Sequence, residues 1–145
     1  MITEISEKLK NFFEEREEVQ FAVIFGSLAK GTANKLSDAD IAVMVDPHFE
    51  DTSPYGYHAT LTADLIQELK QNDVDVIILD EAPILLKYQV LRYGEFIHTR
   101  NKQARIQFQV DTLNQYDDFR ELYRVHEEAS HRRWSKLMDT DTETG

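Results

Sequence analysis

A glycine-serine turn between two short apolar segments constrains the fold more strongly than any other feature of this chain. Residues 19–25 are apolar at every position but one and stop at Gly26, which predicts a buried strand. Residues 38–45 predict a second strand, which ends before Pro47 because proline lacks the backbone donor that a sheet needs. The side chains of this second strand divide between two faces, with Ile41, Val43 and Val45 on one and Asp38, Asp40, Ala42 and Met44 on the other.

The rest of the chain alternates between helical and extended patterns. Apolar residues at steps of three and four predict helices, and short β-branched runs predict strands. The further predicted elements are helices over residues 2–13, 61–69, 83–91 and 105–138 and strands over residues 73–79 and 96–98. This order indicates the α/β (α+β) class, with a small mixed sheet flanked by helices and a long C-terminal helix. We expect one domain over residues 1–138, followed by a polar C-terminal tail over residues 139–145.

The composition narrows the classes of function. The chain has 145 residues, with 16 Lys and Arg against 27 Asp and Glu, and a formal net charge of -11. A general nucleic-acid binder needs a basic face to displace counterions from phosphates, so we expect no direct contact with nucleic acid and a basic protein as partner. The chain has no cysteine, which excludes disulfides, a zinc ribbon and thiol catalysis.

Neither a signal peptide nor a membrane span is expected. The first residues lack the basic and apolar regions of a signal peptide. No apolar run approaches the roughly 20 residues that a helix needs to cross a bilayer. We therefore expect a cytoplasmic protein with no membrane partner.

Two acids open the second strand, and their spacing predicts a metal site. Asp38 and Asp40 stand at positions i and i+2, so their side chains point to the same side, roughly 6.5–7 Å apart along the chain. Two carboxylates that point together are costly unless a cation lies near them. Oxygen ligands without nearby cysteine or histidine suit a hard ion, Mg²⁺ or alternatively Mn²⁺.

The glycine-serine turn supplies groups that bind phosphate. Gly26 lets the backbone approach a phosphate closely, and the Ser27 hydroxyl is a donor to phosphate oxygens. Alone, a glycine-serine pair is usually a loop and an Asp-x-Asp pair is usually a solvated turn. Their combination between two buried strands favours a site for a metal and a phosphate.

The motif Gly26-Ser27, ten residues, Asp38-Ala39-Asp40 resembles the signature of the DNA polymerase β-like nucleotidyltransferase superfamily. The longer strings, residues 25–31 and 37–43, resemble its minimal nucleotidyltransferase (MNT) branch. That family carries a third acid on a later strand, a pattern which Asp75 fits better than Asp73. The resemblance covers residues 19–97 and implies the nucleotidyltransferase fold.

The resemblance also implies a reaction. Asp38, Asp40 and Asp75 are the implied catalytic and metal-binding acids, and ATP is the implied co-substrate. Gly26 and Ser27 are the implied holders of the β- or γ-phosphate, with Lys30 as a weaker candidate. An acceptor hydroxyl would displace pyrophosphate from the α-phosphorus and keep the adenylyl group.

The branch most similar to this chain is the MNT antitoxin of HEPN/MNT (type VII-like) toxin–antitoxin pairs. The implied acceptor is a tyrosine hydroxyl of the cognate HEPN RNase toxin, which is inactivated by AMPylation and forms a hetero-oligomer with its antitoxin. Two alternatives stay open. One is an antitoxin that occludes the toxin by binding alone, and the other is a nucleotidyltransferase for a small-molecule hydroxyl such as an aminoglycoside.

Several further residues have both a functional and a structural interpretation. Arg92 and Arg100 flank the strand at residues 96–98, where contact with a nucleotide or the toxin is one interpretation and ion pairing with surface carboxylates is the favoured one. Arg120 and His126 resemble the Arg-x4–6-His motif of HEPN RNases, which we interpret as a coincidence because the middle of this chain is rich in strands. Tyr116, Tyr123 and Trp134 of the long helix are interpreted as core or partner-contact residues.

Overall fold

The computed structural model describes residues 2–25, 39–70 and 73–144. Its helices are α1 (Ile2–Glu14), α2 (Tyr57–Leu69), α3 (Ile84–Tyr93) and α4 (Lys102–Thr144), with a short 3-10 turn, η1, at Leu79–Glu81. Its strands are β1 (Val19–Phe25), β2 (Ala39–Val45), β3 (Val74–Ile78) and β4 (Glu95–Thr99). The predicted order of helices and strands is confirmed.

Several elements differ from their predicted extent, among them α2, which begins at Tyr57, the third strand and the last helix. The third strand ends at Ile78, because the chain turns into η1 and buries Leu79 there. The last helix begins at Lys102 and continues to Thr144, through the residues expected to form a polar tail. Helix propagation adds one backbone hydrogen bond for each residue that is fixed, so a helix that has already formed extends through polar residues at little cost.

The strands form one mixed sheet in the order β3-β2-β1-β4. β1 is antiparallel to both β2 and β4, whereas β2 and β3 are parallel. The parallel pair is connected by the crossover helix α2, as parallel strands require. The sheet, its flanking helices and the long C-terminal helix confirm the predicted fold class.

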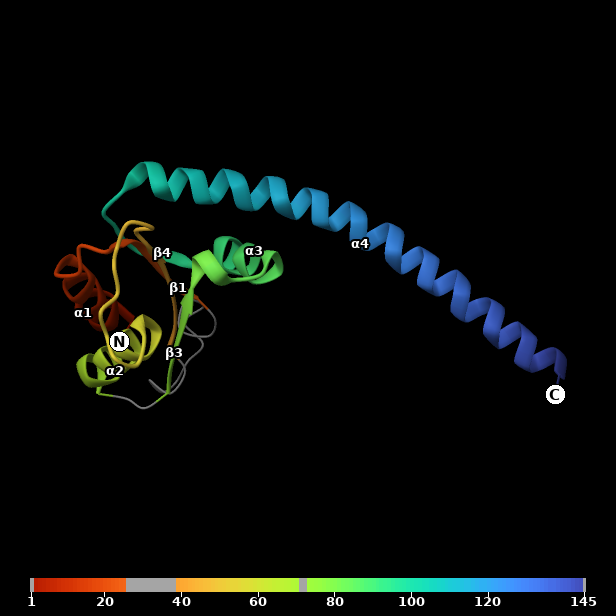
Figure 1. Cartoon of the computed structure of the whole chain (residues 1–145), viewed down its shortest axis with the longest axis horizontal. Coiled ribbons are helices and arrows are strands. Elements are labelled where there is room, and N and C mark those ends of the chain that lie inside the picture. Colours follow the sequence, from red (N-terminus) through yellow and green to blue (C-terminus); the bar gives the residue numbers. More distant parts are fainter. Residues whose placement is uncertain (1, 26–38, 71–72, 145) are drawn as a thin grey trace.

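Helices cover the sheet on both faces, α1 and α2 on one and α3 with the start of α4 on the other (Figure 1). On the first face, Ile41, Val43 and Val45 of β2 are buried with residues of α1 and α2. On the second face, Ala42 is buried and Met44 packs partly buried, together with residues of α3 and α4. The alternation predicted for these residues of β2 is therefore confirmed.

Helix α4 is anchored at its beginning and projects away from the domain over much of its length (Figure 1). Phe108 is buried against Phe21 of β1, with ring centroids 5.3 Å apart. Tyr116 stacks on Tyr88 of α3 with centroids 3.5 Å apart and planes 4° apart. Farther along, Leu122 is 71% exposed. The anchored part of α4 thus covers one face of the sheet, and farther along Leu122, Tyr123 and Val125 expose apolar surface.

No helix in the described ranges is both long enough and apolar enough to cross a membrane.

Candidate active site

Two of the predicted acids lie side by side on neighbouring strands. β2 and β3 pair in parallel, and Asp40 is the register partner of Asp75. On its other side Asp40 is the register partner of Phe25, the last residue of β1. Register partners on adjacent strands are about 4.8 Å apart, so the two carboxylates come from one row of the sheet.

The row lies on the face of the sheet that α3 and α4 cover. Ile41 and Val76, which follow the two acids, are buried among residues of α1 and α2. Because side chains alternate along a strand, Asp40 and Asp75 point to the opposite face, which they share with Ala42. Both acids stand near the beginning of their strands, at the same end of the sheet as the end of β1.

The other predicted site residues lie outside the described ranges: Gly26, Ser27, Lys30 and Asp38. Phe25 directly precedes this segment and Ala39 directly follows it. The segment therefore leaves β1 and enters β2 at the acidic end of the sheet. Its roles in binding metal and phosphate stay predictions.

Asp73, the weaker candidate for the third acid, lies just before β3 and is not part of the strand. Asp75 is on the strand and opposite Asp40, so the register favours it as the partner of Asp40. Asp40 is half-buried and Asp75 is exposed, which leaves carboxylate oxygen accessible at the end of the sheet.

The donor chemistry of this pair fits a hard divalent cation. Two carboxylates on adjacent strands offer oxygen ligands only, which Mg²⁺ and Mn²⁺ prefer. The ranges 2–25, 39–70 and 73–144 contain no group of three or more acidic, histidine or cysteine side chains placed to hold a metal ion. A complete ligand set would thus need a donor besides Asp40 and Asp75, and Asp38 is the sequence-predicted one.

The junction between α3 and β4 packs closely on β1 at the acidic end of the sheet. A Cβ added at Gly94 would lie 2.4 Å from Val23 Cγ1, 2.4 Å from the Val90 carbonyl oxygen and 3.3 Å from that of Ile24. The backbone at Gly94 therefore touches β1 just before Phe25, the register partner of Asp40. Only glycine fits this approach.

Arg92 and Arg100 make contacts that differ from their predicted interpretation. Arg92 donates to the Tyr88 hydroxyl at 3.3 Å, and its guanidinium carbon lies 5.3 Å from the centre of the Tyr93 ring. Arg100 donates to the backbone carbonyl of Glu14. Neither forms an ion pair with a carboxylate in the described part of the chain. Both aromatic partners of Arg92 are local, since Tyr88 lies four residues earlier on α3 and Tyr93 follows directly, whereas the stack of Tyr88 on Tyr116 of α4 has no local sequence signal.

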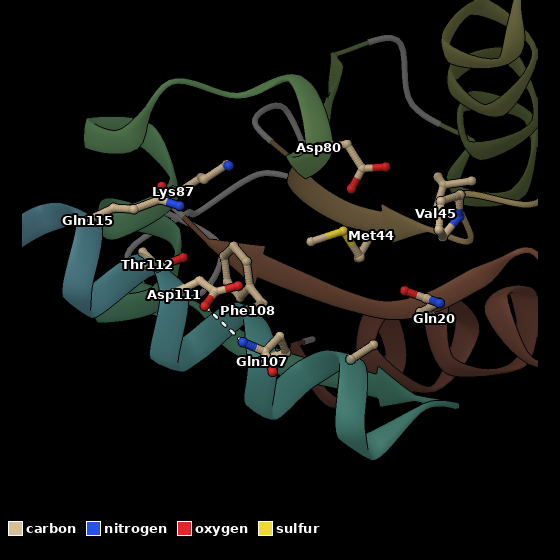
Figure 2. A pocket seen from close by; sticks show the side chains of 12 residues that line it. Gln20, Met44, Val45, Asp80, Lys87, Gln107, Phe108, Asp111, Thr112 and Gln115 are labelled. Carbon is tan, nitrogen blue, oxygen red and sulfur yellow. Dashed lines mark hydrogen bonds between the residues drawn. The ribbon is translucent and has the colours of Figure 1, made fainter.

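The cavity in Figure 2 lies at the opposite end of the sheet from the two acids. It has a volume of about 330 Å³ between the end of β2, η1, α3 and α4, over Met44 and Phe108. Asp80 and Lys87 line it, and burial raises the pKa of the Asp80 carboxyl, an effect that the Lys87 ammonium partly offsets. No local sequence pattern predicts this cavity, since its walls come from β1, β2, η1, α3 and α4.

The pair Arg120 and His126 and the aromatic residues Tyr116 and Tyr123 lie on α4, away from the acids, and the side chain of Trp134 is outside the described part of the structure. Arg120 and His126 are exposed on the part of the helix beyond Tyr116. Tyr116 packs on α3, as a core residue would, whereas Tyr123 is 52% exposed. α4 projects away from the domain over much of its length (Figure 1), and the interpretation of Arg120 and His126 as a coincidence stays a prediction.

The chain is similar to one protein family over most of its length. Residues 7–103 match the model of the family described as polymerase beta, nucleotidyltransferase. These residues include every predicted site residue from Gly26 to Asp75. None of the curated proteins compared with the chain matches it in sequence.

Several solved structures share this fold. A chain from a toxin–antitoxin complex with AMP-PNP is 26% identical with a TM-score of 0.64, over 79% of this chain and 88% of that chain. A chain from the complex of tri-AMPylated Shewanella oneidensis HEPN toxin with MNT antitoxin is 24% identical with a TM-score of 0.62, over 82% and 89%. A chain from the toxin–antitoxin pair MntA-HepT is 23% identical with a TM-score of 0.60, over 81% and 88%.

Proposed function

The chain belongs to the polymerase beta nucleotidyltransferase family, and from that premise we propose that it is an antitoxin which transfers AMP from ATP to a tyrosine hydroxyl of a HEPN-type toxin. The observation that carries the proposal is the register of Asp40 with Asp75 on adjacent parallel strands. This register puts two carboxylates at one end of the sheet, beside the segment that contains Gly26, Ser27 and Asp38.

The proposed reaction is an in-line displacement at the α-phosphorus of ATP. The tyrosine oxygen forms a bond to this phosphorus, the bond to the bridging oxygen of pyrophosphate breaks, and the tyrosine proton passes to a base. Asp75 orients the hydroxyl or accepts its proton. A bound divalent cation, Mg²⁺ or Mn²⁺, would neutralise the negative charge that spreads over the phosphoryl oxygens.

Each site residue has a role in this proposal. Asp38 and Asp40 hold the cation from one strand, and Asp75 holds it from the next. The Gly26 backbone and the Ser27 hydroxyl hold the β- or γ-phosphate, with Lys30 as a further contact. Positioning and neutralisation of charge supply most of the acceleration in transfers of this kind.

The toxin partner is inferred from the similar structures and from charge. The 26%-identical structure is a toxin–antitoxin complex with AMP-PNP, an analogue of ATP. A complex in which one chain shares this fold contains a tri-AMPylated HEPN toxin. A formal net charge of -11 suits a basic partner and speeds its association. The exposed apolar residues Leu122 and Val125 of α4 give a hetero-oligomer further surface to bury.

The test is transfer of label from ATP to the cognate toxin in the presence of Mg²⁺. Asp40→Asn and Asp75→Asn each lower the transfer rate by about 100-fold or more, because each removes a charged ligand of the cation. Asp73→Asn separates the two candidates for the third acid and retains most of the rate. Glu68→Gln on α2, which covers the opposite face of the sheet, is the matched control.

The outcomes separate the proposal from its alternatives. Undiminished transfer by Asp40→Asn would contradict the assigned site. Neutralisation of the toxin by Asp40→Asn without any transfer would indicate an antitoxin that acts by binding alone. Label on small hydroxyl compounds such as aminoglycosides, with none on the toxin, would indicate a small-molecule nucleotidyltransferase. Mass spectrometry of the acceptors identifies the modified hydroxyl in each case.

A further inference from the structure

The end of α3 carries an exposed tyrosine and an arginine beside the acidic end of the sheet. We propose that the ring of Tyr93, with the Arg92 guanidinium against it, is the platform on which the nucleobase of a purine nucleoside triphosphate stacks. This inference rests on the proposed function, because it assigns the base subsite of the same nucleotide. Neither residue belongs to the sequence motif that predicts the metal and phosphate site.

The position of Tyr93 in the fold is set by its neighbour Gly94. The backbone at Gly94 lies against Val23 and Ile24 of β1, as the close approach of its Cβ position indicates. Phe25 follows on β1, and its register partner on β2 is Asp40. Two strand spacings therefore separate the start of β4 from Asp40, about 10 Å, which is comparable to the length of a nucleoside monophosphate. A nucleotide with its α-phosphate at the acids reaches the end of α3 with its base.

Tyr93 and the acids also lie on the same side of the sheet. α3 packs on the sheet through Val90, which is buried with Ala42 of β2. Asp40 points to the face of Ala42, because the two residues are two positions apart on the strand. The proposed base subsite and the two carboxylates thus lie on the same side of the sheet.

The Tyr93 side chain is half exposed, and the Arg92 guanidinium lies beside its ring. Tyr93 is 50% exposed, whereas Tyr88 is half-buried by its stack on Tyr116. The Tyr88 hydroxyl accepts a hydrogen bond from Arg92 at 3.3 Å, and the guanidinium lies 5.3 Å from the Tyr93 ring centre. Tyr116 and Tyr88 therefore hold Arg92 from the side of α4 and leave its planar group at the ring that we assign to the base.

The Tyr93 ring and the Arg92 guanidinium are suited to stacking on the face of a base rather than to hydrogen bonding with its edge. Aromatic rings and guanidinium planes stack on any base, and the larger purines gain most contact area. In the proposed stack the Tyr93 ring and the Arg92 guanidinium meet the face of the base, and the edge that distinguishes adenine from guanine is left without a contact from either residue. We therefore expect a preference for purines over pyrimidines and weak discrimination between ATP and GTP at this platform.

The experiment measures binding by the full chain of a non-hydrolysable ATP analogue and, separately, of inorganic tripolyphosphate, both with Mg²⁺. Tyr93→Ala weakens binding of the analogue by about tenfold, the loss typical of one stacked base, and leaves binding of tripolyphosphate unchanged. Tyr93→Trp restores binding of the analogue, and Arg92→Gln weakens it by less than Tyr93→Ala does. Leu85→Ala, at a residue of α3 that is 48% exposed, is the matched control and changes neither affinity.

Three results would overturn the platform. The analogue binds Tyr93→Ala as tightly as it binds the wild type, or both ligands lose affinity together, which would make Tyr93 a support for the fold or for the phosphates. A loss that Tyr93→Trp fails to restore would also exclude stacking. If the wild type binds neither ligand, the proposed function itself fails, and this result is distinct from the other three.

Discussion

The two faces of the sheet are built for different tasks. The face under α1 and α2 is closed by a large set of buried apolar side chains, among which Leu9, Phe13 and Leu65 have no exposed surface. The face under α3 and α4 has a smaller buried cluster. It also carries the Asp40–Asp75 row at one end and an open cavity at the other. The larger apolar cluster and the Asp40–Asp75 pair of this domain thus lie on opposite faces of the same strands.

The face under α1 and α2 also contains a buried polar side chain. His98 of β4 is buried there, stacked on Phe13 with ring centroids 6.2 Å apart, and its Nε2 has no hydrogen-bond partner among the described residues. Burial is the main cause that lowers the pKa of His98, and the nearby Arg100 adds to it. A neutral imidazole is therefore accommodated in this core as a flat, largely apolar ring.

Neighbouring residues of β2 give the sharpest test of this division. Ile41→Ala removes a fully buried side chain from the closed face and costs about 3 kcal/mol of the free energy of unfolding. Asp40→Asn, one position earlier and on the other face, changes it by less than about 1 kcal/mol while it lowers the transfer rate by about 100-fold or more. Urea denaturation of both variants measures the difference. Equal losses of stability would show that the two faces are not separated as the contacts indicate.

Substitution of Gly94 tests whether the face that carries Asp40 and Asp75 also contains a tightly packed position where an added methyl group lowers stability. Gly94→Ala costs about 2 kcal/mol, because the new methyl group meets Val23 Cγ1 and the Val90 carbonyl oxygen, each at 2.4 Å. Gly56→Ala is the matched control, since Gly56 has a φ of 93° but nothing within 4 Å of the added Cβ. It carries only the smaller conformational penalty, about 1 kcal/mol. Thermal and urea denaturation rank the two, and a reversed order would contradict the close packing of α3 on β1.

Much of this architecture was predictable from local patterns, and the rest depends on contacts between distant segments. The alternation in β2 and the helical spacing of α1 are periodic within a few residues, so the sequence alone predicted their faces. The resemblance to the family pointed to Asp75, and the parallel register with Asp40 places it. Nothing local signals the stack of Tyr88 on Tyr116, because the two residues lie on different helices. The base platform that we assign to Arg92 and Tyr93 involves that stack, so the sequence offered Arg92 as a nucleotide contact but not the platform.

The smallest expected effect concerns Asp80, at the cavity end of the open face. Burial raises its pKa above the ordinary value of 3.8, so the native state binds the Asp80 proton more tightly than the unfolded state does. The ionised carboxylate therefore destabilises the fold at neutral pH. This penalty disappears as the pH falls through the raised pKa and below 3.8. Asp80→Asn then stabilises the protein by at most a few tenths of a kcal/mol near neutrality, and by nothing at about pH 3.

Asp51, in the loop before α2, supplies the control with the opposite sign. The Ser53 hydroxyl and backbone amide both donate to its carboxylate and lower its pKa, so the ionised form stabilises the native state. Asp51→Asn therefore loses stability at neutral pH, and the loss disappears as the pH falls below the ordinary value of 3.8. Urea denaturation of both variants at neutral and acidic pH measures the two signs. A loss of stability in Asp80→Asn at neutral pH would mean that attraction to Lys87 outweighs burial, and the cavity end of the open face would then contribute to stability.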